Sequence, residues 1–201
     1  MKTLLAATLL ALAAATAGAA ATVGQQAPAF SAPDTGGKTV RLADFKGRHV
    51  VLEWVNPECP FVAKHYGSAN MQGTQKEATA KGVVWLAINS TAAGHSEYKT
   101  PAEMAQWMQV QKAAPSATLM DSDGSIGRAY GARTTPHMYI VDPAGRLVYA
   151  GGIDNRPTGD PADIPGATNH VKVALSEALA GRPISQPTTR PYGCSVKYSS
   201  L

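Results

Sequence analysis

A chain of 201 residues, of which 44% are hydrophobic, is long enough to bury a core, and its two cysteines allow one internal bridge at most, so its stability does not depend on a disulfide framework. The net charge of +4 is modest and the basic residues are scattered, which excludes the clustered positive charge of a nucleic-acid-binding surface. We find no internal repeat and expect one domain.

The N-terminus has the pattern of a secretory signal peptide. Lys2 precedes an apolar run over 4–15, and small residues at 17–21 offer a cleavage site. The run is shorter than the roughly 20 residues of a spanning helix, so we expect removal of residues 1–21 and association with a membrane only if the signal is uncleaved. The sequence therefore predicts a periplasmic or otherwise exported protein, in a compartment where thiols can oxidise.

Residues 22–47 are rich in turn formers and contain a short alternating run at 38–42, which predicts a loop and a small hairpin. The β-branched run at 50–55 predicts a central strand. A turn follows, and Cys59-Pro60 reads as the beginning of a helix, because proline suits the first helical position.

The next segments predict a βαβ unit followed by a second helix. The first helix should break near Gly67 or Gly73 and end at Gly82, before an apolar strand at 83–88. Thr100 and Glu103 form a capping box that predicts a helix start.

The second half predicts a short strand at 117–120, a turn at 121–124 that lacks the later glutamate of a calcium loop, and a hairpin of strands 138–141 and 146–149. A surface insertion at 151–168 follows. Asn169 should cap a last helix, and residues 182–201 form a tail without helical pattern that carries Cys194.

Cys59 is the strongest candidate for chemistry. At a helix N-terminus the free backbone N–H groups and the helix dipole favour an anion. A thiol there should ionise more readily than a free one, whose pKa is about 8.5, and the thiolate is the form that attacks.

The strand, turn and helix around Cys59-Pro60-Phe61-Val62, and the later Thr134-Thr135-Pro136-His137 running into a strand, resemble the redoxin branch of the thioredoxin fold. This branch includes peroxiredoxins and periplasmic thiol-disulfide oxidoreductases. The resemblance covers roughly residues 23–181, and implies a domain over 22–181 with a three-layer α/β fold, a central mixed β-sheet flanked by helices and an N-terminal β-hairpin extension. It also implies that Pro136 is cis and faces Cys59, which leaves the Thr135 backbone free to pair with a substrate strand.

This chain departs from the family patterns at two places. Val62 stands where the second cysteine of a C-x-x-C belongs, and the threonine that peroxiredoxins carry ahead of their reactive cysteine is missing. The closest likeness is to a peroxiredoxin-like group with a lone cysteine in this turn. A second thiol must then resolve the product formed on Cys59. We hypothesise that Cys194 does so; a static Cys59–Cys194 disulfide, or no contact between them, are the alternatives.

Besides Pro60, three residues could support Cys59. Glu58 could relay a proton or could raise the thiol pKa by repulsion. His137 could favour the thiolate as a protonated imidazole, and Arg133 could supply positive charge in the same region. His65 is expected to be a packed or surface histidine that points away from the sulfur.

The sequence thus predicts an exported, antioxidant-type thiol oxidoreductase that acts on protein thiols and disulfides or on a hydroperoxide, without a bound cofactor and with an electron donor that the residues do not specify. A copper-delivery protein that binds Cu(I) through Cys59, Cys194 and His137 is one alternative. A non-catalytic interaction module is the other.

Overall fold

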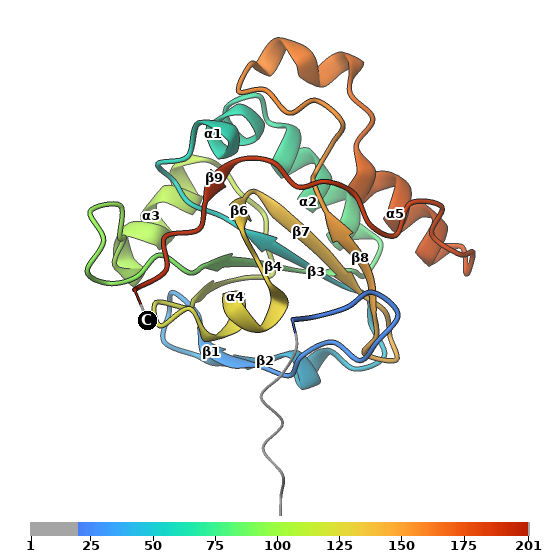
Figure 1. The fold of residues 1–201 in the computed structure, drawn as a ribbon, viewed down its shortest axis with the longest axis horizontal. Coiled ribbons are helices and arrows are strands. Elements are labelled where there is room, and N and C mark those ends of the chain that lie inside the picture. The colour runs from blue at the N-terminus through green and yellow to red at the C-terminus, as the bar shows by residue number, and fades with distance from the viewer. Residues whose placement is uncertain (1–19, 201) are drawn as a thin grey trace, which may run out of the picture.

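The computed structural model describes residues 20–200, so nearly all of the predicted signal peptide lies outside the described residues. The main sheet has five strands in the order β5-β4-β3-β7-β8. Strands β3, β4 and β5 are parallel to one another, β7 is antiparallel to β3, and β8 is antiparallel to β7. Their bounds are β3 Val50–Trp54, β4 Val84–Asn89, β5 Ala117–Met120, β7 His137–Val141 and β8 Leu147–Gly151. This is the expected mixed sheet (Figure 1).

Both faces of the sheet are covered, which explains why β3 and β4 are buried along their whole length. One face packs against helices α1 (Pro60–Gly67), α2 (Asn70–Ala80), α3 (Pro101–Val110) and α5 (His170–Leu179). The other face packs against α4 (Ser125–Tyr130) and the predicted N-terminal hairpin, β1 (Ser31–Pro33) and β2 (Thr39–Arg41), which runs into the 3₁₀ turn η1 (Leu42–Phe45). Cys59 belongs to the first of these layers.

The helix after Cys59 breaks close to the first of the two predicted positions. Helix α1 ends at Gly67 and α2 begins at Asn70, with Ala69 between them in the left-handed region at φ 60°. Gly82 also has a positive φ, 80°, in the turn that leads into β4.

The capping box of α3 is present, since the Thr100 hydroxyl accepts a hydrogen bond from Glu103 N and the Glu103 carboxylate accepts one from Thr100 N. Among the residues described, no helix is both long and apolar enough to cross a membrane.

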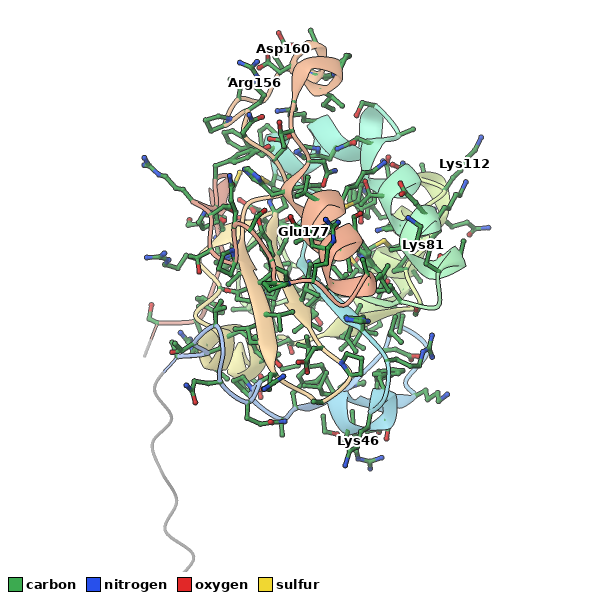
Figure 2. The ribbon with its side chains drawn as sticks, turned by 90° about the vertical axis from the view of Figure 1, so that its right-hand side faces the viewer. Lys46, Lys81, Lys112, Arg156, Asp160 and Glu177 are labelled. Carbon is green, nitrogen blue, oxygen red and sulfur yellow. The ribbon has the colours of Figure 1, made fainter. Side chains whose placement is uncertain are left out.

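The segment between β8 and α5 differs from the predicted surface insertion. Its outer part, with the 3₁₀ helix η2 (Pro161–Gly166), is exposed and lies beside α1, and Figure 2 shows Arg156 and Asp160 at this outer end. Its first residues are buried, including Asp154 at 3% exposure. A polar residue in a Gly- and Pro-rich stretch gives no sequence signal of burial, because only the packing of the tail and α1 around it encloses it.

After α5 the C-terminal tail runs back across the molecule (Figure 1) to β6 (Thr134–Thr135). Its strand β9 (Cys194–Ser195) pairs in antiparallel fashion with β6, which directly precedes Pro136. The tail packs closely against glycines of the rest of the domain, where a side chain would collide with it. A Cβ atom on Gly152, for example, would come within 2.8 Å of Arg190 O. The tail is therefore packed as part of the domain.

Candidate active site

Cys59 is the N-cap residue of α1, with extended backbone angles, φ −84° and ψ 121°, and Pro60 follows at the first helical position. Its backbone N–H donates to Asn56 O and its carbonyl accepts from Ala63 N, so the turn and the helix both fix it. The side chain is only 1% exposed. The predicted strand–turn–helix placement of the cysteine is confirmed.

The Thr135–Pro136 peptide bond is cis, as the resemblance implied. The Cys59 thiol donates a hydrogen bond to the Thr135 carbonyl oxygen, with 3.0 Å between Sγ and O, across 76 residues of sequence. The cis proline segment and the helix cap therefore meet at the sulfur.

The Thr135 backbone is not free for an incoming strand, which corrects the sequence prediction. Cys194 of β9 stands opposite Thr135 in the ladder, and Val196 N donates to Arg133 O further along. The chain's own tail occupies this edge.

Cys194 thus lies beside the carbonyl that accepts from Cys59, and it packs against the core layer that contains Cys59. Both are free thiols. Burial, together with the neighbouring Cys59, raises the pKa of the Cys194 thiol to about 12. The structure brings together the two cysteines that the sequence separates by 135 residues.

Glu58 and Arg133 are placed at the surface. The Glu58 carboxylate forms an ion pair with Lys99, with 2.6 Å between Nζ and Oε1, and it is half-exposed. Arg133 is exposed, and its backbone carbonyl contributes to the pairing with the tail.

His137 does not supply the positive charge that was considered for it. Strand residues alternate between faces, and His137 stacks on Tyr139, in the layer opposite Cys59, with 4.5 Å between ring centroids. Burial, together with the charge of nearby Arg133, lowers the pKa of His137 to about 3, so the imidazole is neutral at neutral pH.

The copper site considered from the sequence would lack its third ligand, because His137 lies on the face of the sheet opposite Cys59. Among residues 20–200, no three histidine, cysteine, aspartate or glutamate side chains gather as a metal site would require.

Sequence reasoning missed a buried polar cluster next to the cysteines. Lys64, His65 and Asp154 are 1%, 0% and 3% exposed, and Tyr192 of the tail reaches them. His65 was expected to be packed or at the surface, and it is packed. A buried lysine on a helix has no sequence signal, because its partner Asp154 lies 90 residues away.

A five-stranded mixed sheet, a cysteine at the N-cap of the helix that follows the central strand, and a cis proline facing that cysteine define a thioredoxin-like protein with one cysteine in the turn. Residues 23–150 match the model of the AhpC/TSA family, and the chain belongs to this family. The chain is also 25% identical over 132 residues to thiol-disulfide oxidoreductase ResA of Bacillus subtilis (strain 168), covering 62% of this chain and 64% of the relative. It therefore spans slightly less than two thirds of that relative.

Two solved structures resemble nearly the whole chain. An uncharacterized conserved protein from Geobacillus kaustophilus is 29% identical with a TM-score of 0.77, and the match covers 90% of this chain and 94% of that one. A hypothetical protein from Sinorhizobium meliloti 1021 is 25% identical with a TM-score of 0.77, covering 91% and 98%. The recognition of the thioredoxin-like redoxin fold from sequence is confirmed.

Proposed function

We propose that this protein is an exported thiol-disulfide oxidoreductase that cycles between a Cys59/Cys194 dithiol and an internal Cys59–Cys194 disulfide. The observation that carries the proposal is the ladder register. Cys194 stands opposite Thr135, and the Thr135 carbonyl accepts the hydrogen bond of the Cys59 thiol. The name of the Bacillus subtilis relative and the family match support this reaction class.

The thiols have different roles because their surroundings differ. Cys194 retains its proton in the dithiol, since its pKa is raised by burial and by Cys59. Cys59, at the helix cap, attacks one sulfur of a substrate disulfide, forms a mixed disulfide and releases the other sulfur as a thiolate, which takes up a proton.

The second step releases the substrate. Once Cys59 is in a mixed disulfide it carries no charge, so one cause of the raised pKa of Cys194 disappears. Cys194 then loses its proton and attacks the Cys59 sulfur, the internal disulfide forms, and the second substrate thiol leaves. Two electrons pass from the protein dithiol to the substrate disulfide, and an external dithiol returns them to close the cycle.

The tail must lift from β6 for the first step. Cys59 is 1% exposed, and the Thr135 residue whose carbonyl accepts from its sulfur is paired with β9, so a substrate sulfur reaches it only when β9 separates from Thr135. The tail then carries Cys194 back for the second step. Export rests on the N-terminal sequence pattern of residues 1–21.

Peptide mapping of the oxidised protein tests the proposal. The reduced protein without residues 1–21 is treated with glutathione disulfide, and we expect a peptide pair linked through Cys59 and Cys194. Cys194→Ser should stop at a Cys59–glutathione mixed disulfide, and Cys59→Ser should stay reduced over the same time. Absence of the linked pair from the wild-type protein would reject the cycle.

A hydroperoxide could also oxidise Cys59, because peroxide reduction begins with the same thiolate. In that case Cys59 becomes a sulfenic acid with release of an alcohol, and Cys194 attacks its sulfur with release of water. Steady-state peroxide consumption driven by a dithiol separates the two. Turnover no faster than that of Cys59→Ser assigns the protein to disulfide exchange, and faster turnover assigns it to peroxide reduction.

A further inference from the structure

Tyr192 fills a buried polar socket formed by Lys64 and His65 of α1 and Asp154 after β8. Its hydroxyl donates to Asp154 Oδ1 at 2.6 Å and lies 3.1 Å from His65 Nε2. The ring packs edge-to-face on Phe61, with 5.8 Å between centroids. Tyr192 is thus held by both its polar and its apolar parts.

The side chains that form the socket balance each other electrostatically. Lys64 Nζ lies 4.0 Å from Asp154 Oδ2 and donates to Arg156 O at 2.8 Å. Burial lowers the pKa of His65 to about 4, so its imidazole is neutral at neutral pH and adds no charge beside the Lys64–Asp154 ion pair. Its Nδ1 faces the Asn70 amide at 2.8 Å.

Asp154 needs the tail. In the described part of the chain its Oδ2 is buried without a hydrogen bond, and its Oδ1 accepts from Arg156 N and from the Tyr192 hydroxyl. A buried carboxylate that loses one of its few donors is costly, which favours the docked tail. Burial and the neighbouring carboxylate of Asp154 raise the pKa of Tyr192, so its hydroxyl stays a donor.

The socket lies on the helix that Cys59 caps, and Tyr192 precedes Cys194 by two residues. Three residues of α1 hold Tyr192, namely Phe61, Lys64 and His65, and all are within six residues of Cys59. Cys194 in turn stands opposite Thr135, whose carbonyl accepts the hydrogen bond of the Cys59 thiol. Tyr192 in the socket therefore anchors the tail where Cys194 reaches the sulfur at the helix cap.

We propose that Tyr192, seated in the Lys64–His65–Asp154 socket, is the positioning residue that brings Cys194 to Cys59 for the second, disulfide-forming step. This rests on the proposed function. On this proposal, the docking of the Tyr192 hydroxyl sets the effective concentration of the Cys194 thiol at Cys59.

The experiment compares Tyr192→Phe with a matched control, Tyr130→Phe, in the protein without residues 1–21. Both remove one tyrosine hydroxyl and keep the ring, but the Tyr130 hydroxyl donates to Pro28 O, away from the tail. Each protein is equilibrated with mixtures of glutathione and glutathione disulfide, and the equilibrium constant for forming the Cys59–Cys194 disulfide is measured.

We expect Tyr192→Phe to lower that constant roughly tenfold, the effect of losing a hydrogen bond to a charged group, while Tyr130→Phe leaves it within about twofold of wild type. In a Cys194→Ser background, Tyr192→Phe should also raise the rate at which iodoacetamide modifies Cys59, because the tail separates more often.

Equal constants in Tyr192→Phe and wild type would overturn the positioning role and leave the proposed function standing. Absence of the disulfide from the wild-type protein would instead defeat the proposed function. The tail residue is changed rather than Asp154, because Asp154→Asn would leave buried Lys64 without its counter-charge.

Discussion

Gly193 passes so close over the cis peptide that a Cβ atom at this position would come within 2.7 Å of the Thr135 carbonyl carbon and 3.2 Å of Pro136 N. Its φ of +136° is also one that residues with side chains rarely adopt. Both atoms it meets are backbone and cannot turn aside. The tail can dock at β6 because residue 193 has no side chain.

Gly193→Ala should therefore separate the tail from β6 while the helices and the main sheet stay folded. We expect iodoacetamide to modify both cysteines at least several-fold faster, and the internal disulfide to form more slowly. The control is Gly159→Ala, because a Cβ atom on Gly159 meets nothing within 4 Å. Unchanged modification of Cys59 in Gly193→Ala would mean that the tail does not cover the sulfur.

The buried carboxylate of Glu53 gives a stability prediction. Tyr66 OH donates to one of its oxygens, and Gln75 Nε2 and Trp85 Nε1 donate to the other. Burial raises the pKa of Glu53, while these three hydrogen bonds act in the opposite direction. The donors hold an acceptor-only group in the middle of β3.

Glu53→Gln places an amide NH₂ group against one of these donors, so we expect the free energy of unfolding in urea to fall by about 1–3 kcal/mol. Glu77→Gln is the control, since Glu77 forms exposed ion pairs with Lys81 and Lys172 and should cost less than about 1 kcal/mol. Equal losses in the two variants would contradict the assignment of an acceptor-only role to Glu53.

The part of this site that the sequence could predict is local. Cys59 at the cap and Pro60 after it follow from the apolar run and from proline's fixed φ, and the hairpin after Pro136 follows from alternation and turn residues. The cis bond came from a family resemblance rather than from physical reasoning.

The part that could not be predicted depends on contacts between distant segments. The tail has no periodicity, so its docking is decided by space left at glycines and by the Thr135 backbone, neither of which is visible in the residues around Cys194. Lys64 and Asp154 were missed for the same reason, because each looks like a surface residue until its partner is placed.

His137 leads to a prediction about acid stability. Its pKa of about 3 in the folded protein lies below the usual 6.5, so between these values the unfolded chain binds a proton that the folded protein does not. Stability should therefore fall as the pH is lowered through this window, by up to about 1.4 kcal/mol per pH unit for this group.

His137→Asn should remove that contribution and keep an acceptor near the position of Nδ1, which now faces Arg133 N and Tyr139 OH. The measurement is the slope of the unfolding free energy against pH between about pH 4 and 6, in wild type and variant. An imidazole NMR resonance of His137 that titrates near pH 6.5 would contradict the prediction.

Val62 bears on the proposed use of Cys194 as the partner of Cys59. It occupies the third helical position after the cap, faces the core at 0% exposure, and stands where a C-x-x-C would have its second thiol. Val62→Cys should supply a resolving thiol within the same turn, at a packing cost of about 1 kcal/mol.

We expect the oxidised Val62→Cys protein to yield mainly a Cys59-to-62 link in peptide maps, because a four-residue loop is closed more easily than one through the tail. Adding Cys194→Ser should then no longer stop the reaction with glutathione disulfide at the mixed disulfide. Val62→Ala, which loses packing without gaining a thiol, controls for disturbance of α1 and should keep the Cys59–Cys194 link. A Val62→Cys protein that still formed only the Cys59–Cys194 link would contradict this expectation. Tail docking would then outcompete the new thiol in the turn, and the valine at position 62 would not explain why Cys194 is needed.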